Sequence, residues 1–130
     1  MTAAARYRAA CAALGLPVWR PGMLSTHGAR VLGAGLWASQ SGVTFADENI
    51  DEEPDFADPA TVGCLLAAVR EAWQAPYMHV VWMGNTPAGP STSSWWSACI
   101  DCRVVGHGPT EAAALIAALE AAAARRGGQP

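Results

Sequence analysis

Two segments in the second half of the chain share one pattern, a proline at the start of a run rich in alanine and leucine. The first run follows Asp58 and the second follows Gly108. Proline suits the first turn of a helix because its missing N–H would have no partner there, and the Asp58 carboxylate can cap the free amides of that turn. The pattern predicts helices over 59–74 and 109–124, each beginning at its proline.

Both predicted helices carry apolar residues on one side. These residues recur every three or four positions, which is the spacing of a helix face that packs against a core. They are Val62, Leu65, Leu66, Val69 and Trp73 in the first helix and Ala112, Leu115, Ile116, Leu119 and Ala123 in the second. We therefore expect both helices to pack on a sheet.

The segment between the two helices has the composition of strands. A β-rich run over 77–83 is followed by a loop rich in glycine and proline over 84–90. We expect the segment 94–105 to return beside that run as its antiparallel partner. The predicted order over 59–126 is helix, hairpin, helix.

The N-terminal part, residues 1–46, has a different pattern. In the alanine-rich segment 2–16, Tyr7, Cys11 and Leu14 follow each other at spacings of four and three, which predicts a short helix that ends at Gly15. Glycine and proline then interrupt short apolar pieces, as is typical of a strand meander. We expect strands near 23–25, 30–32, 36–39 and 43–45.

Chain length and composition predict one domain over residues 1–130. With 130 residues, about half of them apolar, the chain can bury one core without a metal or a disulfide. The acidic segment 47–58 reads as a solvated connection between the two halves. We expect an α+β layered sandwich in which the two main amphipathic helices pack on an antiparallel sheet, with Trp19 and Trp37 in its core.

The charges argue against large polyanionic partners. The net charge is −3, and the chain has eight arginines, scattered along its length, and no lysine. Nucleic-acid polymers are therefore disfavoured, although one or two arginines beside a helix N-terminus suit a small anion. The chain has no membrane-length apolar run and no signal-like N-terminus, so we expect a cytoplasmic protein without a membrane partner.

Four cysteines raise the question of disulfides or zinc. We expect free thiols, because Cys64 lies on the inward face of a predicted helix, where a thiol behaves as a small hydrophobe. Cys99 and Cys102 form a C-x-x-C inside a predicted strand, where residues three apart point to opposite faces. No second cysteine or histidine pair stands at the spacing of zinc ligands.

The sequence contains no recognisable catalytic constellation. His27, His79 and His107 share no spacing with acids or cysteines that would build a triad or a metal site, and the common nucleophile and phosphate-loop motifs are absent. We expect a protein that is not an enzyme, with no catalytic residue, no metal and no cofactor.

The segment 103–110 is a candidate ligand site. A predicted strand ends there in a glycine-flanked turn that leads into a helix N-terminus, where unpaired amides attract anions. Arg103 and His107 would add charge and a donor, and Thr110 would add an amide. Alternatively, the glycines only make the turn and Glu111 satisfies the helix dipole, so that nothing binds there.

Three tryptophans crowd the predicted hairpin. They are Trp82, Trp95 and Trp96, and Asn85 lies at the hairpin tip. Adjacent residues of a strand face opposite ways, so at least one of Trp95 and Trp96 points away from the core. An outward tryptophan can fill a subunit interface, stack on a purine, or pack against the strands of 18–45.

Four segments carry a family resemblance. They read LGLP at 14–17, WRPGM at 19–23, DPATVGCLLAAVREAW at 58–73 and HGPTEAAAL at 107–115. Together they resemble small phage and prophage proteins of the phage αβα-sandwich type, among them the phage anti-Thoeris sponges. The resemblance implies a homo-oligomer that sequesters cyclic ADP-ribose-type signals or cyclic oligonucleotides in the host cell without degrading them.

The resemblance also suggests roles for residues. In that family an aromatic residue and an asparagine hold the base, while arginines, some on the last helix, hold phosphate; here the last helix has no arginine before Arg125. The resulting hypothesis is a phage-encoded anti-defence protein that binds a small nucleotide signal. Its predicted ligand-binding residues are Trp82, Asn85, Trp95, Trp96, Arg103, His107 and Thr110. The alternative is a protein-interaction module that uses an exposed tryptophan face and has no small ligand.

Overall fold

The computed structural model describes residues 1–33, 35–40, 42–45, 52–84 and 95–127. In chain order the elements are α1 (Ala3–Leu14), β1 (Arg30–Gly33), β2 (Leu36–Ser39), β3 (Gly42–Phe45), α2 (Pro59–Trp73), β4 (His79–Gly84), β5 (Trp95–Ile100), β6 (Arg103–Gly108) and α3 (Glu111–Gly127). The strands form two antiparallel three-stranded sheets, β1-β2-β3 and β4-β5-β6. The expected α+β class, with helices layered on an antiparallel sheet, is confirmed.

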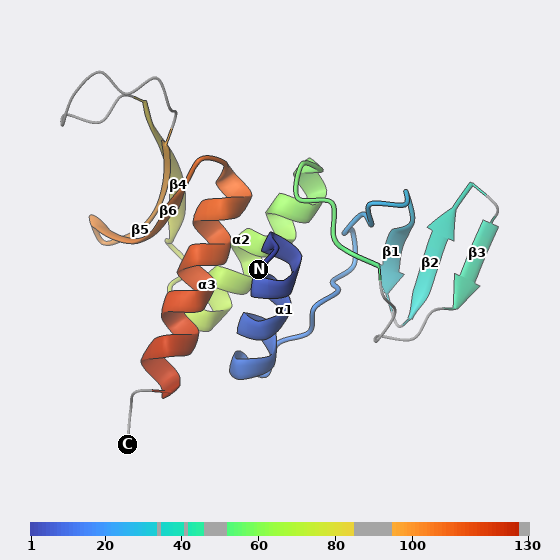
Figure 1. The fold of residues 1–130 in the computed structure, drawn as a ribbon, viewed down its shortest axis with the longest axis horizontal. Helices are drawn as coiled ribbons and strands as arrows, with labels where there is room; N and C mark the ends of the chain where they lie inside the picture. The colour runs from blue at the N-terminus through green and yellow to red at the C-terminus, as the bar shows by residue number, and fades with distance from the viewer. Residues whose placement is uncertain (34, 41, 46–51, 85–94, 128–130) are drawn as a thin grey trace.

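Helix α3 lies at the centre of the architecture. One side of α3 packs against β6 and β5, and its other side packs against α1 and α2, while the β1–β3 sheet lies at the opposite end of the molecule (Figure 1). α3 thus makes most of the helix–sheet contact, whereas α2 packs mainly on α3. Within the described residues, no helix combines the length and the apolarity needed to cross a bilayer.

The starts of the first two helices follow from local capping. The Asp58 side chain accepts a hydrogen bond from the Thr61 amide at 3.0 Å, and Pro59 occupies the first turn, as the sequence predicts. In α1, Thr2 caps the N-terminus and Gly15 ends the helix in the left-handed region at φ 69°. Both helices therefore begin where their capping residues stand.

The start of α3 differs from the prediction. Pro109 precedes the helix, and the Ala113 amide donates to Thr110 Oγ1 at 3.0 Å, so that Thr110 is the capping residue and the helix begins at Glu111. A threonine next to a proline is the better cap because its hydroxyl accepts from a free amide, which proline cannot do.

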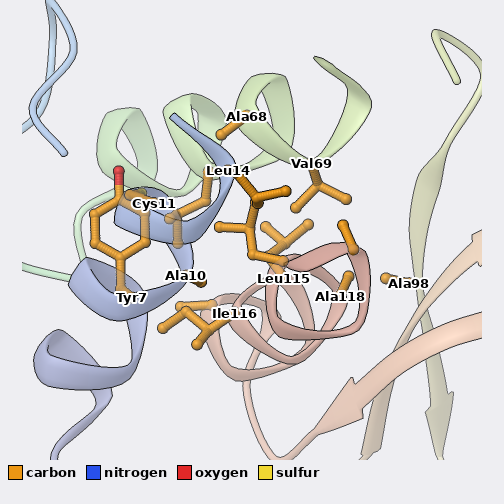
Figure 2. Close-up of a cluster of buried hydrophobic side chains, with 14 of the residues drawn as sticks. Tyr7, Ala10, Cys11, Leu14, Ala68, Val69, Ala98, Leu115, Ile116 and Ala118 are labelled. Atoms are coloured by element: carbon orange, nitrogen blue, oxygen red, sulfur yellow. The ribbon is translucent and has the colours of Figure 1, made fainter. Parts of the chain in front are cut away.

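The core joins α1, α2 and α3 (Figure 2). Tyr7, Cys11 and Leu14 of α1 are buried as predicted. In α2, Leu65 and Val69 are buried but Val62, Leu66 and Trp73 are half-buried, because Thr61 and Ala68 share the inward face. In α3 four of the five predicted face residues are buried and Ala123 is half-buried, while Ala114, Ala118 and Ala122 are buried in addition, since this helix is covered on two sides.

Two glycines lie in β6 rather than in a turn. A Cβ on Gly106 would stand 2.5 Å from the Ala114 carbonyl oxygen and 2.5 Å from the Ala118 nitrogen, and one on Gly108 would stand 2.6 Å from Ala113 Cβ. Both glycines thus allow α3 to approach β6 at backbone distance. The idea that they make a turn before the helix is wrong.

The predicted single strand over 94–105 is two strands. The chain reverses at Asp101 and Cys102, whose φ values are 50° and 64°, and β6 returns beside β5. Two consecutive left-handed residues match the twist of a tight hairpin. Cys102 therefore lies in a turn and not in a strand with Cys99, and all four cysteines are free thiols.

The strands of the N-terminal sheet agree with three of the four predicted positions. The exception is 23–25, where Leu24 and Ser25 make only isolated bridges to Arg30 and Pro54. Glycines with positive φ on both sides, Gly22 and Gly28, bend the chain too soon for a continuous strand. Trp37 is buried, and Trp19 is half-buried against it with ring centroids 4.7 Å apart.

Candidate ligand-binding groove

The β4–β6 sheet separates the predicted site residues onto its two faces. Ala98 and Gly106 pair with each other on the face that meets α3. Trp95 belongs to the opposite, outer face, where its ring contacts the His107 ring at 5.1 Å between centroids. Trp95 and His107 therefore meet each other, on the side of the sheet that faces away from α3.

Trp82 and Trp96 lie on the helix-facing side. Trp82 of β4 pairs with Trp96 of β5. Trp96 also pairs with Gly108, at the end of β6 that leads into α3. Trp96 is half-buried, whereas 57% of Trp82 is exposed. Trp95 and Trp96 therefore lie on opposite faces of the β4–β6 sheet, as the sequence predicts.

The structure keeps Arg103 away from the other predicted ligand residues. Arg103 lies beside the β5–β6 turn and pairs with Ile100, whereas Thr110 follows the other end of β6. Five residues of strand separate the two ends, which is about 16 Å. Arg103 and Thr110 cannot hold one small phosphate together, and Asn85 lies outside the described residues.

A groove lies where the N-terminal ends of α2 and α3 meet the sheet. Its volume is about 530 Å³. The residues that line it are Phe56, Ala57, Pro59, Val62, Trp96, Pro109, Thr110, Glu111 and Ala112. Two of the predicted ligand residues, Trp96 and Thr110, therefore share one concave site of the size of ordinary small-molecule pockets.

The groove is apolar with one acidic side chain. Phe56, Val62 and Trp96 supply aromatic and aliphatic surface, and among the described lining residues Glu111 carries the only charge. The hydroxyl of Thr110 already accepts the Ala113 amide. The groove therefore suits a flat, uncharged ring with an N–H donor better than it suits an anion.

Asp58, which stands between the lining residues Ala57 and Pro59 in the sequence, is already paired. Its two oxygens accept hydrogen bonds from Arg30, each at 3.2 Å, and one of them also accepts from the Thr61 amide and hydroxyl. The bond to Arg30 is the main reason that the pKa of Asp58 lies below its ordinary value. Asp58 thus joins Arg30 to the first turn of α2 and is not free for a ligand.

A second cavity adjoins the groove along α2. Its volume is about 370 Å³, and its lining residues are Pro59, Val62, Gly63, Leu66, Arg70, His79, Val80, Glu111 and Leu115. Pro59, Val62 and Glu111 line both cavities. The Arg70 Nε donates to the Met78 carbonyl oxygen at 2.8 Å, which anchors the guanidinium at the far end.

Two of the four thiols, Cys11 and Cys64, are at least partly buried. Burial raises the pKa of Cys11 and of Cys64, so both are protonated at neutral pH. Across the ranges that the structure describes, no three histidine, cysteine, aspartate or glutamate side chains gather as metal ligands would.

Comparisons with known proteins identify no relative of this chain. No family model, curated protein or solved structure matches the chain. The resemblance to the phage αβα-sandwich and anti-Thoeris proteins therefore stays a prediction, and function has to be inferred from the groove itself.

Sequence reasoning missed Phe56 and Val62 as groove residues and Arg70 as a residue of the second cavity. Phe56 is the one aromatic residue of the acidic segment 47–58, and it stands two positions before the capping Asp58. An isolated aromatic residue in a charged connection is a signal that it packs on something, and its ring contacts Tyr7 at 5.8 Å. The sequence contains no comparable signal for Val62 or Arg70, since both fit an ordinary amphipathic helix.

Proposed function

We propose that this chain is a non-catalytic binding protein that sequesters a small nucleotide signal, with a base of the ligand in the groove beside Trp96. The observation that carries this proposal is the apolar groove of about 530 Å³ walled by Phe56 and Trp96. The family resemblance would make the ligand a cyclic ADP-ribose-type or cyclic oligonucleotide messenger.

The chemistry of the groove fits a nucleobase. A base has a flat π-face that stacks on an aromatic side chain, and such stacking contributes about 1–3 kcal/mol per base. Glu111 lines the same groove, and its carboxylate can accept a hydrogen bond from an exocyclic amino group. We therefore expect a preference for adenine, guanine or cytosine over uracil, which has no amino group.

The experiment is a calorimetric titration with cyclic ADP-ribose isomers and cyclic di- and trinucleotides, followed by chromatography of the released ligand. Trp96→Ala should weaken binding about tenfold or more, because it removes the stacking surface. Trp95→Ala is the matched control, since it removes the same side chain from the adjacent position on the other face of the sheet.

Two outcomes would refute the proposal. The first is a lack of binding across the whole panel. The second is an equal loss in the Trp95 and Trp96 variants, which would indicate a general effect on the sheet. Recovery of a degraded ligand would instead point to an enzyme.

A second candidate function is self-association through the outer face of the β4–β6 sheet. The described residues of this face carry no acidic side chain and no arginine; they are Val81, Trp95, Ser97, Cys99, Val104 and His107. Val81 and Val104 are 36% and 50% exposed. The solvent face of an antiparallel sheet is normally polar, so an uncharged one favours a protein partner.

A further inference from the structure

We propose that Arg70 forms an anion subsite at the far end of the second cavity, where it holds the phosphates of the ligand whose base lies beside Trp96. This inference rests on the proposed function and deepens it. It replaces Arg103, which lies at the β5–β6 turn, with an arginine that lines the same groove system as Trp96.

The adjacency of the two cavities carries the inference. They share the lining residues Pro59, Val62 and Glu111, so they adjoin along α2, and a ligand that occupies both lies against these three residues. One end has aromatic walls and the other end has Arg70. This distribution matches a molecule with a flat apolar part and an anionic part.

Arg70 is available for an anion. Its Nε is bound to the Met78 carbonyl oxygen, which fixes the plane of the guanidinium and leaves the two terminal nitrogens for other partners. In the described part of the chain, no carboxylate lies within ion-pair distance of Arg70, whereas Arg6, Arg20 and Arg30 each pair with an acid. A pre-oriented guanidinium without an acidic partner is a good phosphate ligand.

The length of the groove indicates the class of ligand. Pro59 and Arg70 are eleven positions apart, which is about 16 Å of helix at about 1.5 Å per residue. This exceeds the length of one nucleoside monophosphate. The ligand that fills both ends is therefore a nucleotide with more than one phosphate or more than one nucleoside, and Glu111 in the middle faces its uncharged part.

Arg70 also has a structural role that the test must separate from binding. It stands in the last turn of α2, where a cation complements the helix dipole. A purely structural role would change the stability of the fold and would not distinguish a phosphorylated ligand from an unphosphorylated one.

The test compares adenosine with ADP-ribose, because the two probes share a base and only the second carries phosphates. Arg70→Gln should lower the affinity for ADP-ribose by roughly tenfold to a hundredfold, the loss expected for a charge-assisted hydrogen-bonded contact. Its affinity for adenosine should not change. Arg103→Gln is the matched control, since it removes the same charge at the remote turn and should leave both affinities unchanged.

Each result decides between the two proposals. Equal ADP-ribose affinity in the natural chain and in Arg70→Gln overturns the anion subsite, even if Trp96→Ala abolishes binding and so supports the groove. A natural chain that binds neither these two probes nor any cyclic nucleotide of the panel overturns the groove as well. If Arg70→Gln unfolds, Arg70→Lys retains the charge but not the forked donors, and the subsite then predicts a selective loss of ADP-ribose affinity in that variant.

Discussion

Arg30 and Asp58 form a two-bond ion pair that joins β1 to the first turn of α2, with Nη1–Oδ2 and Nη2–Oδ1 distances of 3.2 Å each. The same carboxylate caps α2 through the Thr61 amide, and the Thr61 hydroxyl accepts from the Leu24 amide at 2.9 Å. One side chain thus connects the N-terminal strands, the helix start and the wall of the groove.

The ion pair predicts a dependence of stability on pH. Because Arg30 holds the pKa of Asp58 below its ordinary value, the charged carboxylate stabilises the folded state. This stabilisation is fully present above the pKa of the unfolded carboxyl and is lost as the pH falls through the lower pKa of the folded protein. We expect the difference in free energy of unfolding between the natural chain and Asp58→Asn to be largest near neutral pH and to shrink in acid.

Urea denaturation at a series of pH values measures this difference. Asp58→Asn keeps an acceptor for the Thr61 amide, so Asp58→Ala should lose about 1 kcal/mol more for the missing cap. A difference between the natural chain and Asp58→Asn that stays constant from neutral pH into acid would contradict the role of the charge.

Gly106 should not tolerate a side chain. Gly106→Ala places a Cβ 2.5 Å from backbone atoms of Ala114 and Ala118, and these atoms cannot move without shifting α3. We expect a loss of about 1–3 kcal/mol in the free energy of unfolding. Gly63→Ala is the control: this glycine lies inside α2 with open space around it, and alanine there should stabilise the helix by about 0.5–1 kcal/mol. Thermal unfolding of both variants tests the pair, and equal shifts would refute the close approach.

A glycine in the turn between β5 and β6 should increase the stability of the folded protein. Cys102 has a φ of 64°, a conformation that costs a residue with a Cβ about 1–2 kcal/mol. Cys102→Gly should therefore raise the midpoint of urea unfolding. Gly15→Ala, at a φ of 69°, should lower it for the same reason. An unchanged midpoint in Cys102→Gly would show that the turn is relaxed.

Thr110 should act as a cap and not as a phosphate ligand. Thr110→Ala removes the acceptor of the Ala113 amide and should cost about 1 kcal/mol of stability, whereas Thr110→Ser should retain it. At protein concentrations and temperatures where both variants are folded, nucleotide affinity should be the same in each. A selective loss of affinity in Thr110→Ala would show that the hydroxyl of this groove residue contacts the ligand.

A separate prediction concerns the self-association of the chain. If the outer face of the β4–β6 sheet is an interface, Val104→Glu should shift the chain towards the monomer in analytical ultracentrifugation, because it would bury an unpaired charge. Leu32→Glu is the control, as Leu32 is also about half exposed but lies in the other sheet. A monomeric natural chain at micromolar concentration would exclude this interface.

The features predicted well from the sequence are those that depend on neighbouring residues. Asp58 and Pro59 mark the start of α2 because a cap acts within one turn, and Gly15 marks the end of α1 in the same way. Periodicity also predicted the buried positions Leu65, Val69 and Leu115, although not which element would cover each of them.

The features missed depend on contacts between distant segments. Gly106 reads as a turn residue until the position of α3 is known, because its reason for being glycine lies eight and twelve residues away in Ala114 and Ala118. The turn at Asp101 and Cys102 has no glycine or asparagine to reveal it. Once that turn is placed, Arg103 moves to the far end of the sheet, and the predicted grouping of Arg103 with Thr110 fails.

The central position of α3 determines how the molecule opens. Since the β4–β6 sheet and the helices α1 and α2 are joined mainly through α3, no large part of the core can separate while this helix stays in place. Amide hydrogens in the middle of α3 should therefore exchange with solvent only when the whole chain unfolds, whereas the β1–β3 sheet can open alone and exchange earlier. The groove, whose walls include the first turn of α3, should persist through such partial openings.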